Sequence, residues 1–262
     1  MHFYERLERS TRKWWFYVVL YLIPSLIPPY SLKRGFIAGP EIGEVTGLIL
    51  RYSLVPYRLY QPLLHLILIL MILLVLFLGN RFGRIFTAFM GLHYIFISIL
   101  QGTAHLKDYG FSMLLGNMLW FFFIASLLLW EAAIRKTDFT FHRVEAWRLW
   151  VIPLAVLAFW CPMRPWRFDP MDLIKSDSTL AFCMMTPIYL SIMSFLIPRV
   201  NLPMVRVMSF IGSVMGFYNM FWAVVIGGRL GRGSASFTSH YSQSQSTHSY
   251  YPLGLADWES LR

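Results

Sequence analysis

The chain has 262 residues, of which 57% are hydrophobic and 14% are charged, and its formal net charge is +10 at pH 7. Soluble domains carry about 25% charged residues, so this composition excludes an ordinary water-soluble domain. The basic residues are spread over the polar connections and form no stripe, which argues against nucleic acid as a partner. Such scattered basic residues are typical of segments that flank membrane spans beside anionic lipid.

Seven apolar stretches without Asp, Glu, Lys or Arg in their interiors occupy most of the chain. A helix of about 20 apolar residues crosses the ~30 Å hydrocarbon layer, and a backbone in lipid must satisfy its own hydrogen bonds. The sequence therefore predicts an all-α fold, a polytopic integral membrane helical bundle of about seven transmembrane helices plus one interfacial helix. The predicted organisation is a basic N-terminal segment (1–13), a membrane-spanning bundle (14–228) and a polar low-complexity tail (229–262) that we expect to be mostly disordered.

The first predicted span covers residues 14–30, and prolines bend or end its far side. Residues 31–60 form the longest internal connection. Within it, apolar residues share one helical face opposite two glutamates and an arginine (Ile42, Val45, Leu48, Ile49 and Tyr52 against Glu41, Glu44 and Arg51). This pattern favours either a helix in the plane of the membrane interface or an amphipathic lid packed on the bundle.

The six further predicted spans follow in chain order at 62–78, 85–103, 111–130, 147–160, 180–197 and 207–227. A short turn joins the second and third spans, which predicts antiparallel neighbours. Pro153 and Pro187 each remove a helical hydrogen bond, and broken helices mark binding sites in some transporters. The last span carries small residues at helix-packing spacing, which indicates close approach of two backbones within the chain or between subunits (Ser209, Gly212, Ser213 and Gly216).

Seven spans place the two termini on opposite sides of the membrane. The basic residues divide almost evenly between the two predicted sides, so their count alone does not set the orientation. The strongly basic flank before the first span favours a cytoplasmic N-terminus. The predicted location is the cell membrane, multi-pass.

Two histidines, His65 and His93, lie well inside predicted spans, where an ionisable side chain is a functional candidate. Their Cα heights differ by roughly 7 Å at 1.5 Å per residue, which argues against one b-type haem held by both rings. Gln101 lies nearer the level of His65. Gln101 and His105 are four residues apart, which predicts that they share a helical face, and Lys107 and Asp108 follow them.

These side chains define a candidate polar corner that opens on one membrane surface (His65, Gln101, His105, Lys107 and Asp108). The polar corner could form a proton relay or a site for a lipid headgroup. The alternative is a structural role, in which these side chains only hydrogen-bond to one another and cap helix ends. His93 and Asn219 are the candidate intramembrane polar residues. Asn219 in an apolar span favours a bridge to a neighbouring helix.

No metal site is predicted. The spacing of His142 to Glu145 resembles a metal-binding helix, but it occurs once. Asp169, Asp172 and Asp177 do not match a calcium loop. Zinc-helix, phosphate-loop, nucleophile-elbow and dinucleotide motifs are absent from the sequence, so the catalytic residues, if any, are unknown.

Three functions fit these observations. The first is a transport or transport-accessory membrane subunit, with the lipid bilayer and a membrane protein partner or a second copy as its surroundings. The second is a membrane-embedded enzyme acting on a lipid or isoprenoid through the polar corner. The third is an electron-transfer anchor carrying haem b, and otherwise no cofactor is expected.

Overall fold

The computed structural model of the chain describes residues 2–141, 145–160 and 170–230, and the side chains of residues 4–141, 145–160, 170–171 and 173–218. It divides into two compact units, Met1–Met215 and Gly216–Arg262. The described residues are mostly helical. The α-helices are α1 (His2–Ser10), α2 (Trp14–Ser25), α3 (Glu41–Tyr52), α4 (Gln61–Leu78), α5 (Asn80–Gly102), α6 (Leu115–Ile134), α7 (Val151–Trp160), α8 (Asp172–Lys175), α9 (Phe182–Leu196) and α10 (Leu202–Leu230). Three short 3-10 helices are η1 (Val55–Tyr60), η2 (Ala146–Arg148) and η3 (Ser178–Leu180).

Within the described part of the chain, three helical stretches are long and apolar enough to cross a membrane: Glu41–Leu78, Asn80–Gly102 and Leu115–Ile134. A fourth candidate is the pair Leu173–Leu180 and Phe182–Leu196, which is bent by 92° at its break. The predicted helical class is confirmed, whereas the count of seven spans is not. For two predicted spans the shortfall is one of length, because α2 has 12 residues and α7 has 10, and at 1.5 Å per residue they reach only about 18 and 15 Å. The predicted span 207–227 lies in α10, and its side chains beyond residue 218 lie outside what the structure describes.

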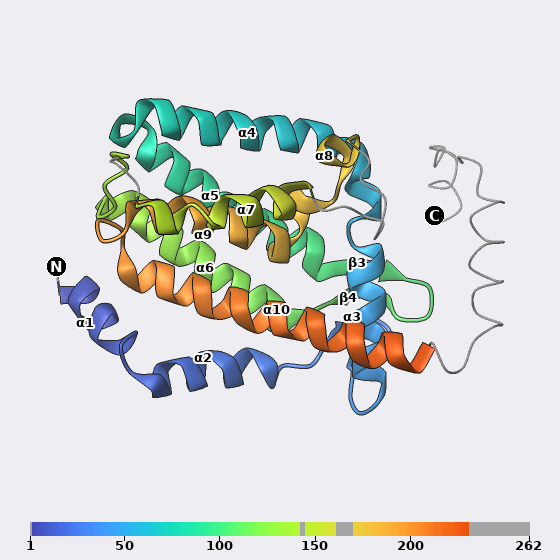
Figure 1. Cartoon of the computed structure of the whole chain (residues 1–262). Coiled ribbons are helices and arrows are strands. Elements are labelled where there is room, and N and C mark those ends of the chain that lie inside the picture. Colours follow the sequence, from blue (N-terminus) through green and yellow to red (C-terminus); the bar gives the residue numbers. More distant parts are fainter. Residues whose placement is uncertain (1, 142–144, 161–169, 231–262) are drawn as a thin grey trace, which may run out of the picture. The chain divides into compact units, whose positions relative to one another are not determined.

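The long helices pack around buried aromatic rings. The rings of Phe121 on α6 and Phe182 on α9 stack with centroids 4.0 Å apart, and Tyr94 on α5 lies within 5.8 Å of Tyr189 on α9. Each of these four side chains is almost fully buried. In Figure 1 the turn between α4 and α5 lies at the left, and the ends of α5 and α6 nearest β3 lie at the right.

A small antiparallel sheet, which was not predicted, joins two connections at one end of the long helices. Its order is β2-β1-β4-β3, and its strands are β1 (Tyr30–Ser31), β2 (Gly35–Phe36), β3 (Thr103–Leu106) and β4 (Gly110–Met113). Ala104 and Leu106 point into a core that also contains Val45 and Ile49 of α3. The amphipathic segment predicted at 41–52 is therefore a helix whose apolar face packs as a lid on this sheet.

Candidate functional site

The bent helix pair Leu173–Leu180 and Phe182–Leu196, a candidate broken span, carries a run of polar residues at its bend. Ser176, Ser178 and Thr179 are fully buried, although they lie between two apolar segments. Irregular backbone inside a membrane is tolerated only where protein or an aqueous cavity surrounds it. Polar side chains of α4 and α5 bond to this run, and Phe159 of α7 also contacts it, with its carbonyl oxygen 3.5 Å from Ser176 Oγ.

His65 of α4 is bonded through both ring nitrogens. Its Nδ1 lies 2.8 Å from the Gln61 carbonyl oxygen, which only accepts, so Nδ1 carries the proton of the neutral ring and Nε2 is the acceptor. The Ser178 hydroxyl lies 3.0 Å from Nε2 and donates to it. The Ser176 hydroxyl lies 3.1 Å from Ser178 Oγ and 3.3 Å from the same Nε2. Two serine hydroxyls therefore converge on one basic nitrogen.

Gln61 connects this group to the end of the bundle. Its Oε1 accepts from the Thr179 hydroxyl at 2.6 Å, and its Nε2 donates to Asp177 Oδ1 at 3.4 Å. Asp177 also forms an ion pair of 3.6 Å with Arg58, whose side chain is half-exposed. We call Gln61, His65 and the segment Ser176–Thr179 the polar break.

His93 of α5 closes the inner side of the polar break. Its Nε2 donates to the Thr179 carbonyl oxygen at 2.7 Å, and its Nδ1 accepts from the Tyr189 hydroxyl at 2.6 Å. Haem ligation would require one ring nitrogen of His93 and one of His65 to leave these bonds. Chemically, the polar break offers paired hydroxyl donors and a histidine base within one buried cluster.

The predicted polar corner is only partly brought together. Gln101 accepts from the Phe182 N–H at 3.0 Å, where α9 begins, so it contacts the same broken span as His65. The prediction that Gln101 and His105 share a helical face is wrong, because α5 ends at Gly102 and the chain continues as strand β3. The His105 ring lies 5.3 Å from the Phe111 ring and is tilted against it, and Lys107 and Asp108 lie in the hairpin turn that follows.

The other predicted positions have separate outcomes. Gly212 lies against α9, since a Cβ there would come within 2.8 Å of Thr186 Cγ2, which agrees with the packing prediction; Ser209 is half-buried and Ser213 is exposed. Gly216 begins the second unit. The side chain of Asn219 and the residues His142 and Asp169 lie outside what the structure describes. The side chain of Asp172 also lies outside the described part, and among the side chains that are described (residues 4–141, 145–160, 170–171 and 173–218) no group of metal-binding residues occurs.

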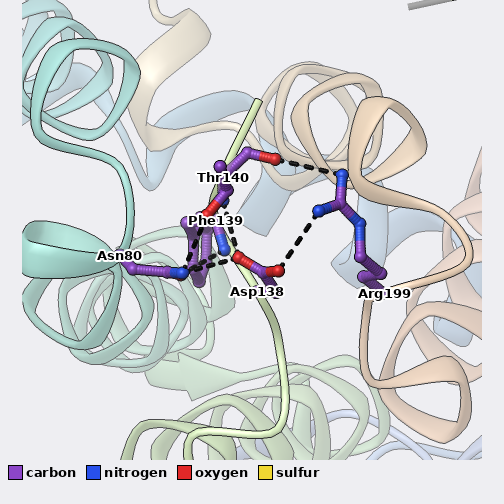
Figure 2. A network of polar contacts seen from close by, with 5 residues as sticks. All are labelled: Asn80, Asp138, Phe139, Thr140 and Arg199. Carbon is purple, nitrogen blue, oxygen red and sulfur yellow. Dashed lines mark hydrogen bonds and ion pairs between the residues drawn. The ribbon is translucent and has the colours of Figure 1, made fainter. Parts of the chain in front are cut away.

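At the opposite end of α5, a second polar network fixes the loop after α6 (Figure 2). Asn80 accepts from the Phe139 N–H at 2.5 Å and donates to Asp138 Oδ1 at 2.6 Å. Asp138 also forms a 3.2 Å ion pair with Arg199. Hydrogen bonding by Thr140, with that of Asn80, lowers the pKa of Asp138 to about 2.

Behind this network, Glu131 is a buried carboxylate in the last turn of α6. Its Oε1 accepts from the Thr137 N–H at 2.5 Å and its Oε2 from Asn201 Nδ2 at 2.6 Å. Glu131 and Asp138 border a cavity of about 500 Å³, which four cationic residues also line (Arg81, Arg84, Arg135 and Lys136). We call this cavity the cationic pocket.

Sequence reasoning did not find the serines of the polar break or the buried role of Glu131. Ser176 and Ser178 stand in a polar connection, where hydroxyl residues are ordinary. Glu131 directly follows the predicted span 111–130 and precedes other charged residues, so in the sequence it resembles a solvated charge of a loop. The sequence feature that could have indicated this site is the run Ser176-Asp177-Ser178-Thr179. Four consecutive polar residues stand there directly before an apolar helix.

Comparison with protein-family models, with curated proteins and with solved structures found no match to this chain.

Proposed function

We propose that the chain is a multi-pass integral membrane protein of the cell membrane, with its N-terminus in the cytoplasm, and that it acts as a transport or transport-accessory subunit. The observation that carries this proposal is the polar break. A span bent by 92° presents buried hydroxyl groups to a histidine and a glutamine on neighbouring helices. Broken helices with polar groups near the middle of the bilayer are where many transporters bind their substrates.

A lipid environment is supported by the outward face of α4. Its large apolar side chains are strongly exposed, with Phe77 83% and Leu66 63% accessible, and Leu63 and Leu70 more than half accessible. A contiguous apolar face of this kind marks a membrane or protein contact. Lipid acyl chains would cover it without any specific partner, although a second copy or a partner subunit fits the same face.

In the arrangement described, the groups of the polar break are paired with one another. A solute would enter by exchanging its own donors and acceptors for the bonds of Ser176 and Ser178 to His65. The carboxylate of the polar break, Asp177, is already paired with Arg58. A solute without net charge, either neutral or zwitterionic, therefore suits this cluster.

The geometry of Ser178 and His65 favours a second candidate, a membrane-embedded enzyme acting on a lipid or isoprenoid ester. A hydroxyl 3.0 Å from an imidazole Nε2, with Nδ1 held by an acceptor, is the arrangement of a nucleophile and its general base. On this alternative, Ser178 Oγ attacks the ester carbonyl carbon while His65 Nε2 takes its proton. The ester C–O bond then breaks, the alcohol leaves with that proton, and water later releases the acid from the acyl-serine. The two candidates therefore use the same residues in different ways.

One pair of measurements separates them. The full-length protein is purified in detergent and treated with a fluorophosphonate, which labels activated serines. Labelling of the wild type that disappears in Ser178→Ala and persists in Ser126→Ala, an exposed serine on α6, supports the enzyme and opposes transport.

Transport requires the other result. The protein is reconstituted in proteoliposomes, alone and with any co-purifying subunit, and uptake is measured over a panel of neutral solutes. We expect uptake by the wild type and by Ser126→Ala, and at least about a tenfold loss in His65→Ala and Ser178→Ala, since each loses a hydrogen bond to a buried group. Uptake that is unchanged in both variants contradicts the proposal.

A further inference from the structure

The cationic pocket lies at the end of α5 and α6 opposite the sheet and is separate from the polar break. Arg81 and Arg84 come from the first turns of α5, and Arg135 and Lys136 follow the end of α6. The cavity of about 500 Å³ is in the range of small-molecule sites. The positive end of the α5 dipole faces the same region.

The carboxylates that border the cationic pocket are bonded elsewhere. Glu131 is occupied by Thr137 and Asn201, and Asp138 is paired with Arg199. Among the residues that the structure describes, no ion pair joins the four cations of the pocket to a carboxylate. Lys136 alone has another contact, with its ammonium 5.1 Å from the centre of the Tyr4 ring. Glu131 keeps its negative charge, because both of its donors are neutral, but four cations line the pocket against two carboxylates. The lining therefore has a net positive charge.

The walls of the pocket are held in place by the chain itself. Asn80 ties the loop to the start of α5 (Figure 2), and the Phe139 ring packs so closely on Gly83 that a Cβ there would lie 2.3 Å from it. Arg135 has a φ of 54°, a left-handed conformation that non-glycine residues rarely adopt and that recurs at ligand sites. A glycine would be the favoured residue at this helix end, so the arginine side chain is retained at a conformational cost.

We propose that the cationic pocket binds a phosphate group, carried either by an anionic lipid or by a soluble phosphate ester. Guanidinium groups pair with phosphate oxygens through two parallel hydrogen bonds, and the pocket presents three of them with one ammonium. Basic pockets between membrane helices on the cytoplasmic side bind anionic headgroups, and this end of α5 is the predicted cytoplasmic one. The lipid source rests on the proposed membrane insertion, whereas phosphate binding does not depend on transport.

The test uses full-length protein in neutral detergent and follows its melting temperature. The probes are sodium pyrophosphate against chloride of equal ionic strength, and short-chain phosphatidic acid against short-chain phosphatidylcholine. A rise in melting temperature with either probe supports the proposal. A rise with both probes indicates a site for any phosphate group, a rise with phosphatidic acid alone indicates a lipid headgroup, and a rise with pyrophosphate alone indicates a soluble phosphate ester. No rise with either probe overturns it.

Three variants show whether the response comes from this pocket. Arg84→Gln and Arg135→Gly should each weaken the apparent affinity for the effective probe by about tenfold to a hundredfold, the loss of one charge-assisted hydrogen bond. Arg135→Gly should also raise the melting temperature without ligand, because glycine fits the positive φ; lost binding in a stabilised protein is not a folding defect. Lys107→Gln is the control: it also removes one positive charge, but beyond the other end of α5. Its melting temperature should rise with the effective probe as that of the wild type does.

A wild-type response in Arg84→Gln and Arg135→Gly overturns the proposal. Flotation with vesicles of phosphatidylcholine alone reports membrane insertion separately. Failure to float would therefore contradict the proposed membrane function and leave the pyrophosphate result to decide phosphate binding.

Discussion

Replacing Glu131 by leucine should destabilise the protein by about 2–6 kcal/mol. The carboxylate is only 2% exposed and accepts from the Thr137 N–H and from Asn201 Nδ2. Leucine is similar in size to glutamate but has no acceptor, so both donors stay buried without a partner. Each unpaired buried donor lowers the free energy of unfolding by about 1–3 kcal/mol.

The assay is equilibrium unfolding by denaturant in mixed micelles, followed by tryptophan fluorescence. Asn201→Leu removes one of the two bonds, so its effect and that of Glu131→Leu should not add in the double variant. Glu44→Leu, an exposed carboxylate on α3, serves as the control and should stay within about 0.5 kcal/mol of the wild type. A Glu131→Leu protein as stable as this control would refute the assignment of a buried, doubly bonded carboxylate.

Three further predictions concern stability. Gly83→Ala should lower the free energy of unfolding by about 1–3 kcal/mol, because the new Cβ would lie 2.3 Å from the Phe139 ring; Phe139→Leu should restore part of that loss, and an alanine variant of wild-type stability would rule out this contact. Tyr189→Phe removes the donor to His93 Nδ1 and should destabilise by about 1–3 kcal/mol, whereas an unchanged melting temperature would show that this bond is not formed. The pKa of Asp138 is lowered from 3.8 to about 2, so its contribution is fully present above pH about 4 and is lost as the pH falls through about 2; Asp138→Asn should flatten this part of the stability curve, and identical curves would contradict the network in Figure 2.

The long helices were predictable because apolar runs of sufficient length have few alternatives in lipid. The runs predicted at 62–78 and 85–103 correspond to α4 and α5, and the run at 111–130 overlaps α6, displaced by the sheet that precedes it. The helix count was less predictable. Length in the sequence does not reveal where prolines end a helix, and Pro24 lies within the last turn of α2.

The sheet was missed because its strands have two to four residues, too few to show an alternating pattern. Its central pairing joins Tyr30 to Met113, a contact between distant segments that local sequence does not encode.

The candidate sites were predictable only where an ionisable side chain stood inside an apolar run. His65 and His93 met this criterion, and both lie in or beside the polar break. Ser178 did not, because its role depends on a bend between α8 and α9 that turns a polar connection back into the helices. The same applies to Arg135, whose place in the cationic pocket follows from the end of α6.

The most direct test of this account asks whether α5 crosses the membrane. Its 23 residues span about 34 Å at 1.5 Å per residue, with Arg81 at one end and Lys107 just beyond the other. Arg81→Cys and Lys107→Cys are made separately in a Cys161→Ser, Cys183→Ser background and exposed to an impermeant maleimide in sealed, oriented vesicles. If α5 crosses the membrane, the two cysteines react from opposite sides, with position 81 on the cytoplasmic side. Reaction of both from the same side, or release of the protein by alkaline carbonate, would contradict it.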